Sequence, residues 1–181
     1  VMMLIGFAGF AAGTWMVTGI TADWDFYELL WPQILRGTCL MMLMVPINNI
    51  ALGTLPPERM KNASGLYNLT RNLGGAVGLA IINTILSTRT DEHHMRLAER
   101  IDWSNPEALD WMANVTATYN GYGLDGAAIA VKKLSGIVGQ QSTIMAFGDV
   151  FLLLTFLFIG LSALTMMVQR PGARKVTADA H

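Results

Sequence analysis

Long apolar stretches alternate with shorter polar ones along this chain, and the apolar stretches have the length of membrane-spanning helices. A helix needs roughly 20 mostly apolar residues to cross the hydrocarbon core of a bilayer. Four stretches meet this requirement, and they cover residues 1–21, 29–55, 63–87 and 144–168. We therefore predict an all-α membrane protein with four transmembrane helices.

The polar connectors indicate how these helices are oriented. Short loops rich in Lys and Arg mark the cytoplasmic side of a membrane. Basic residues occur in residues 56–62 and in the tail 169–181, whereas residues 21–28 include acidic residues and no basic one. We expect both ends of the chain to be cytoplasmic, which makes the long polar segment 88–143 extracytoplasmic.

The segment 88–143 carries signals for short helices. Ser104 and Glu107 have the spacing of a capping box, which predicts the start of a helix, and the glycine-rich residues 120–123 predict its end. Asp125 is placed to cap a second helix, which we interpret as an interfacial helix leading into the last span.

Two adjacent histidines, His93 and His94, lie in the same polar segment. No cysteine or acidic residue stands at a metal-ligand spacing from them, although acidic residues are adjacent. We interpret both as solvated loop residues.

The composition agrees with a membrane protein and excludes several other classes. The chain is 52% hydrophobic and 14% charged, and its net charge of −1 provides no basic surface for nucleic acid. One cysteine, Cys39, cannot form an intramolecular disulfide or a zinc cluster. No nucleophile, phosphate-binding or cofactor motif is present, so we predict neither an enzyme nor a cofactor. Because Val1 already lies in an apolar run, we expect a piece of a longer polypeptide.

The third apolar stretch contains the most unusual polar residues. Asn68, Arg71 and Asn72 stand at i, i+3 and i+4, so they share one helix face. An arginine in hydrocarbon costs at least about 2.5 kcal/mol, and such a face should therefore point at protein or a water-filled cavity. A role in gating or substrate binding is one interpretation; snorkelling of Arg71 to the headgroups is the other.

The glycines that follow predict close helix packing. Gly74 and Gly78 are four residues apart, and Gly75 lies between them. Small residues at this spacing let two helix backbones approach each other. We expect another helix to pack tightly on this surface, and ordinary helix packing without a special role is the alternative.

Two further sets of polar residues lie in the predicted spans. Arg36 and Asp149 lie at similar depths below the outer ends of different spans, which makes pairing between them a hypothesis. Both are candidates for substrate binding or gating, and an aspartate can also carry a proton, but a purely structural bridge is the commoner case. Asn48 and Asn49 follow Pro46, and together they either break the helix at mid-depth or accompany a tolerated kink.

Several stretches together carry a family resemblance, and they are residues 31–37, 46, 51–56, 63–80 and 146–151. In this order they resemble the fourteen-helix drug:proton antiporters of the major facilitator superfamily, the EmrB/QacA type. The glycine–arginine stretch is the most specific of them.

The resemblance implies that the four spans are helices eleven to fourteen, in the C-terminal bundle of a major facilitator fold. It implies a bacterial inner-membrane exporter of small amphiphilic compounds that exchanges protons for substrate by alternating access. Its partners would be the lipid bilayer, the missing N-terminal helices, the substrate with protons and, in some members, a periplasmic adaptor. A non-catalytic membrane subunit or anchor is the alternative that the residues leave open.

Overall fold

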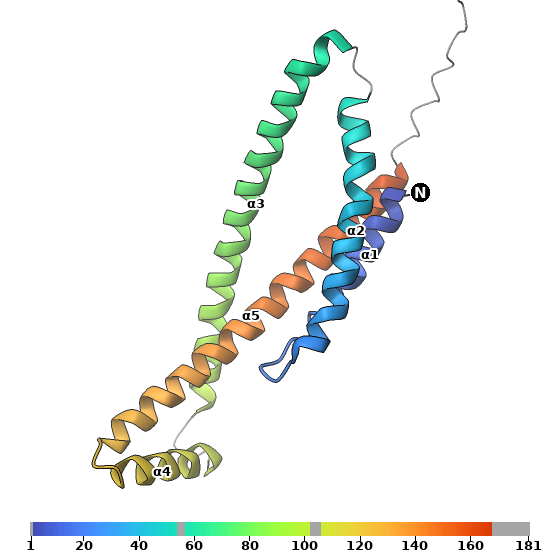
Figure 1. The fold of residues 1–181 in the computed structure, drawn as a ribbon. Coiled ribbons are helices and arrows are strands. Elements are labelled where there is room, and N and C mark those ends of the chain that lie inside the picture. The colour runs from blue at the N-terminus through green and yellow to red at the C-terminus, as the bar shows by residue number, and fades with distance from the viewer. Residues whose placement is uncertain (1, 54–56, 102–105, 168–181) are drawn as a thin grey trace, which may run out of the picture.

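Helices make up nearly all of the part of the chain that the structure describes. The structure is a computed structural model, and it describes residues 2–53, 57–101 and 106–167. In these ranges the elements are, in chain order, α1 (Met2–Trp15), α2 (Phe26–Leu52), α3 (Pro57–Arg100), α4 (Pro106–Asn120) and α5 (Gly126–Met167) (Figure 1). The prediction of an all-α protein is confirmed.

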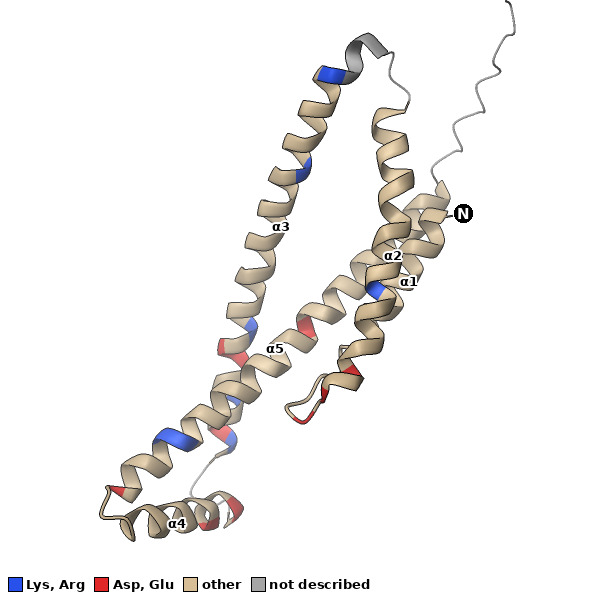
Figure 2. Ribbon diagram, in the orientation of Figure 1, with Lys and Arg blue, Asp and Glu red and all other residues tan. Residues whose placement is uncertain are grey.

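Three of these helices are long and apolar enough to cross a membrane, namely α2, α3 and α5, and α1 is a shorter apolar helix. With 44 and 42 residues, α3 and α5 are each roughly 65 Å long, about twice the thickness of a bilayer's hydrocarbon core. Both helices therefore extend well beyond any membrane that they cross. Figure 2 shows many of the charged residues in the region where α3, α4 and α5 meet and around the loop before α2.

α1 packs closely on α2 because glycines face that neighbour. A Cβ added to Gly6 would lie 2.7 Å from Cγ of Leu43, and one added to Gly13 would lie 2.7 Å from Cγ of Arg36. Gly9, which stands between them at GxxxG spacing, faces the sulfur of Cys39. The close approach of these two helices leaves no room for larger side chains at the three glycines.

α5 is the central helix, since it contacts α1, α3 and α4. Its contact with α1 includes a buried hydrogen bond of 3.0 Å from the Thr155 hydroxyl to the Thr14 hydroxyl. α3 has few contacts with α2, and one of its bonds to that helix runs from the Tyr67 hydroxyl to Oδ1 of Asn48, at 2.7 Å. α3 reaches α5 only toward its C-terminal end (Figure 1), so its first half is largely exposed.

The helix ends follow several of the expected local signals. α4 ends at Asn120, and the turn that follows includes Gly123 at φ +74°, a conformation that favours glycine. The Asp125 carboxylate accepts a hydrogen bond of 3.1 Å from the N–H of Ala128 and caps the next helix as predicted. Ser104, the expected cap of α4, lies outside the described residues.

The polar segment 88–143 differs from the expected loop in one respect. α3 continues without a break to Arg100, and the helix that Asp125 caps is α5 itself, continuous to Met167. The prediction of a separate interfacial helix before the last span was therefore wrong. Its described residues include the end of α3, the whole of α4 and the start of α5.

Candidate functional site

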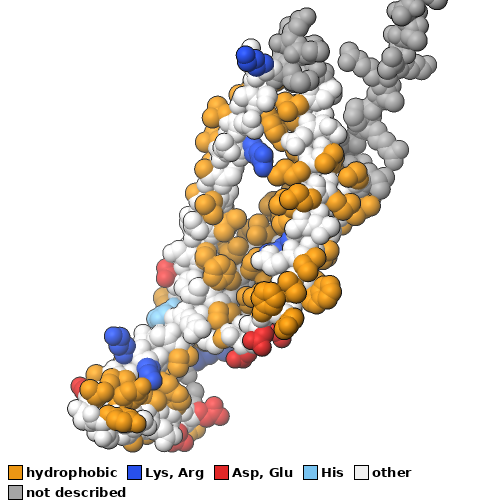
Figure 3. All heavy atoms as spheres, viewed as in Figure 1, with side chains coloured by type: hydrophobic (Ala, Val, Ile, Leu, Met, Phe, Trp, Pro, Cys, Tyr) orange, Lys and Arg blue, Asp and Glu red, His pale blue; other side chains and the backbone are white. Residues whose placement is uncertain are grey.

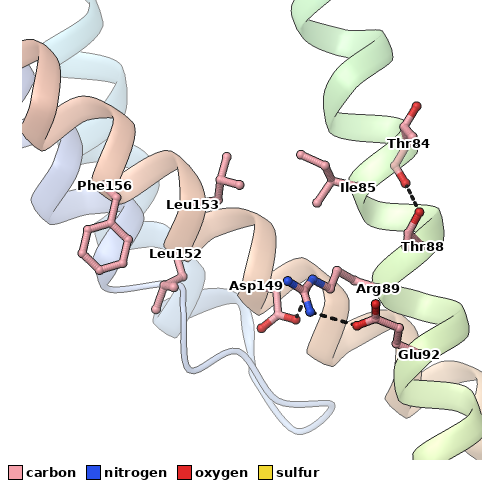
Figure 4. Close-up of a pocket in the computed structure, with 9 residues that line it drawn as sticks. All are labelled: Thr84, Ile85, Thr88, Arg89, Glu92, Asp149, Leu152, Leu153 and Phe156. Carbon is pink, nitrogen blue, oxygen red and sulfur yellow. Dashed lines mark hydrogen bonds and ion pairs between the residues drawn. The ribbon is translucent and has the colours of Figure 1, made fainter.

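Four ionisable side chains meet where the C-terminal part of α3 passes α5. Nε2 of His93 lies 2.9 Å from Oδ2 of Asp149, and Nε of Arg89 lies 3.9 Å from the same oxygen. Arg89 also donates through Nη1 to Glu92, at 2.9 Å. We call these four residues the α3–α5 cluster; Figure 4 shows three of them.

The helical repeat of α3 builds its side of this cluster. Arg89, Glu92 and His93 stand at i, i+3 and i+4 and therefore share the face that α5 approaches. Asp149 reaches them from α5, next to Gly148, where a Cβ would lie only 2.8 Å from the carbonyl oxygen of Thr18. α5 is thus held tightly against the turn after α1 while its Asp149 side chain points to α3.

The interpretation of His93 as a solvated loop residue was wrong. His93 is 9% exposed, whereas the neighbouring His94 is exposed as expected. The predicted helix ended at residue 87 because the residues that follow are polar. The i, i+3, i+4 spacing of Arg89, Glu92 and His93 was the available signal that the helix continues.

A groove of about 560 Å³ lies beside the cluster. Apolar side chains of α5 line one side, Ile85 and two threonines of α3 line the other, and the charged groups lie at one end (Figure 4). Its lining residues are Thr84, Ile85, Thr88, Arg89, Glu92, Asp149, Leu152, Leu153 and Phe156. The Asp149 side chain, which borders this groove, is 42% exposed. Within the described ranges, no group of three His, Cys, Asp or Glu residues has the geometry to hold a metal.

Arg36 does not pair with Asp149, so that hypothesis was wrong. Arg36 donates to Oε1 of Gln33 at 2.6 Å, and its guanidinium carbon lies 5.3 Å from the ring centroid of Phe151. Residues 149 and 151 are separated by about 200° around the helix, since each residue turns it by about 100°. Phe151 therefore faces α2 while Asp149 faces α3.

The polar face of α3 is exposed. Asn68, Arg71 and Asn72 are all exposed, and no hydrogen bond or ion pair of their side chains occurs in the part of the chain described. The glycines after them, Gly74, Gly75 and Gly78, have no atom within 4 Å of an added Cβ. The structure thus brings these residues to one open surface without a partner helix, and their roles stay predictions.

The asparagines of α2 lie near the end of that helix. Asn48 accepts the bond from Tyr67, and the Asn49 carbonyl accepts a hydrogen bond of 2.9 Å from the N–H of Gly53. α2 continues through Pro46 to Leu52, so the proline does not end the helix. Of the two interpretations of Pro46, the structure therefore agrees with a proline that the helix tolerates.

Sequence comparison finds relatives over almost the whole chain. The colistin resistance protein EmrB of Acinetobacter baumannii is 33% identical over 172 residues, which cover 93% of this chain and 32% of that protein. The multidrug export protein EmrB of Escherichia coli K12 is 31% identical, over 92% of this chain and 32% of its own length. The fatty acid resistance protein FarB of Neisseria gonorrhoeae is 26% identical, over 94% of this chain and 32% of its own length.

These relatives are transporters and not enzymes. No family model matches the chain, and no solved structure matches it. The chain spans about a third of the length of the relatives that it matches. The resemblance to EmrB-type drug efflux proteins is thus confirmed, since more than nine-tenths of the chain is similar to about one third of each of these relatives.

Proposed function

We propose that this chain is the C-terminal part of a secondary active multidrug exporter, which exchanges protons for small amphiphilic compounds by alternating access. One observation carries the proposal: more than nine-tenths of the chain matches about a third of each of several export and resistance proteins. In alternating access, two helix bundles rock about a site between them. This chain would supply helices of one bundle. The other bundle would come from the rest of the longer protein of which we propose this chain to be a part, and we call that longer protein the natural-length protein.

The arrangement of the helices supports a four-span topology. α2, α3 and α5 are long and apolar enough to cross the membrane, and the shorter apolar helix α1 with its flanking residues would be the fourth span. In the proposed orientation both termini face the cytoplasm of a bacterial cell. α4 and the adjoining ends of α3 and α5 would then project on the outer side of the inner membrane, where a periplasmic adaptor would be reached.

The open face of α3 supports the proposal that this chain needs further helices to form a complete transporter. Arg71 is too costly to expose to lipid without compensation, and Asn68 and Asn72 add polar groups to the same face. Apolar side chains also cover much of the surface that Figure 3 displays. We infer that helices of the other bundle, or a water-filled substrate cavity, cover the α3 face in the complete transporter.

The proposal is tested by an efflux assay on the natural-length protein. It is expressed in bacteria that lack their major exporters, and the accumulation of a fluorescent amphiphilic dye is followed. We expect lower accumulation than in cells with an empty vector, and we expect a protonophore to abolish the difference. An export function would be contradicted if cells with the protein in their membrane accumulated dyes and the common classes of drug to the same level as cells with the empty vector.

A further inference from the structure

The α3–α5 cluster has no role in the function proposed above, and its geometry suggests one. We propose that His93 and Asp149 form a proton-binding site that fastens the C-terminal part of α3 to α5, and that this contact tightens when His93 is protonated. The proposal concerns a contact between two helices of this chain, and it does not depend on what the protein transports.

The hydrogen bond between the two residues determines where the proton binds. An ionised carboxylate only accepts hydrogen bonds, so Nε2 of His93 must carry the hydrogen in its 2.9 Å contact with Oδ2 of Asp149. Nδ1 is then the basic nitrogen of the neutral ring. Uptake of a proton from water at Nδ1 leaves the Nε2–H bond intact and converts a hydrogen bond between a neutral ring and a carboxylate into an ion pair.

The neighbouring charges give the direction of the effect. With a neutral ring, the carboxylates of Glu92 and Asp149 outnumber the guanidinium of Arg89 by one charge; with a protonated ring, the four charges balance. Charged hydrogen bonds are roughly twice as strong as neutral ones. Acidification that protonates the ring should therefore strengthen the contact.

The other elements packed on α5 bring one further charge near the cluster in the described structure, the guanidinium of Arg36 on α2, which lies over the ring of Phe151 on a different side of α5 from Asp149. Near Asp149, the turn after α1 presents the carbonyl oxygen of Thr18 to Gly148. The nearest lysine of α5 to Asp149 along the chain, Lys133, is bonded to the hydroxyl of Tyr119 at 2.7 Å and lies roughly 24 Å away along the helix. Arg89 and Glu92 are therefore the charged groups whose presence modifies the pair.

The position of the pair gives it control over how α3 is held. α3 has few contacts with α2, and it is α5 that fixes its C-terminal half. The pair lies at this attachment and borders the groove of about 560 Å³. The Asp149 side chain is 42% exposed, so the effect is limited to that of a partly exposed ion pair.

Amide hydrogen exchange in the natural-length protein, purified in detergent, tests the proposal. Exchange of residues 85–97 is measured at pH 5.5 and 7.5 and corrected for the intrinsic effect of pH. We expect about two- to fivefold slower corrected exchange at pH 5.5, the range set by partly exposed ion pairs. His93→Gln keeps an N–H donor that does not titrate, so the pH difference should disappear, as it should in Asp149→Asn.

His94→Gln is the matched control, because it removes the adjacent exposed histidine and should retain the pH difference. Unchanged exchange in α1 verifies that each variant is folded. The proposal is overturned if the unmodified protein shows no pH difference in residues 85–97, or if the protection is greater at pH 7.5. It is also overturned if folded His93→Gln keeps the difference, or if His94→Gln loses it.

Discussion

Arg36 shows how a charged residue inside an apolar helix is accommodated by contacts other than an ion pair. Its guanidinium lies over the ring of Phe151 and donates to Gln33. We expect a double-mutant cycle between Arg36→Gln and Phe151→Leu to give a coupling of about 0.5–1 kcal/mol, the size of a cation–π contact at a partly exposed site. The unfolding free energy in mixed detergent micelles is the measurement.

The same measurement on Arg36→Gln and Asp149→Asn should give additive effects within about 0.5 kcal/mol, because the two side chains face different neighbours. A coupling of more than about 1 kcal/mol in this second cycle would restore the pairing that depth along the helices first indicated.

Depth along a helix could be estimated from the sequence, but the direction of a side chain around the helix could not be matched between helices. Arg36 and Asp149 were correctly found to be exceptional, yet their partners depend on how α2, α3 and α5 are rotated about their own axes. His93 was missed for a related reason. Its burial depends on α3 continuing as a helix through a polar stretch, which composition alone argues against.

Arg71 differs from Arg36 in its surroundings, since it lies on an open face of α3. If it acts through directional hydrogen bonds, lysine lacks the planar fork, and Arg71→Lys should reduce efflux by the natural-length protein at least about tenfold. If it only snorkels to the headgroups, lysine should replace it almost freely. The measurement is drug efflux at matched membrane abundance; full activity of both Arg71→Lys and Arg71→Gln would reject a functional role.

At the scale of the helices, glycines of α5 divide into packed and open positions. Gly148 faces the Thr18 carbonyl, a backbone group that cannot turn away, whereas Gly136 has no atom within 4 Å of an added Cβ. We expect Gly148→Ala to lower the unfolding free energy by about 1–3 kcal/mol, as overpacking does. Gly136→Ala, the control, should be neutral or stabilising by up to about 1 kcal/mol, since alanine favours a helix.

Thermal unfolding in detergent ranks the two glycine variants. A Tm for Gly148→Ala equal to or above that of Gly136→Ala would show that α5 is not held against the turn after α1 as the structure has it.

The helices themselves were largely predictable, because runs of about 20 apolar residues leave the chain few other structures in a membrane. Gly9 and Gly13 stand at GxxxG spacing, which places both on the side of α1 that meets α2. The lengths of α3 and α5 were not predictable in the same way. Hydropathy reports where a helix leaves the hydrocarbon, and it carries no signal for helical turns that continue into water.

At the scale of the whole molecule, the proposed topology places the two ends of α3 on opposite sides of the membrane. A cysteine introduced for exposed Lys61 should be protected from an impermeant thiol reagent in intact cells, and one introduced for Tyr122, which is 75% exposed, should react. Cys39→Ala provides the background, although Cys39 is itself buried. Equal reaction of both introduced cysteines in intact cells would contradict the topology.

The complete transport cycle should require more than these 181 residues. Alternating access needs two bundles that move about a shared site, and the open polar face of α3 has no partner among the helices described here. We therefore expect residues 1–181 expressed alone to reach the membrane but to give no drug resistance and no proton-dependent efflux. Co-expression with the remainder of the natural-length protein should restore part of the efflux, since the exposed α3 face would then find its partner helices. Robust efflux from vesicles that contain only residues 1–181 would show that this chain transports by itself, and it would replace the two-bundle proposal with one in which copies of the chain assemble around the substrate.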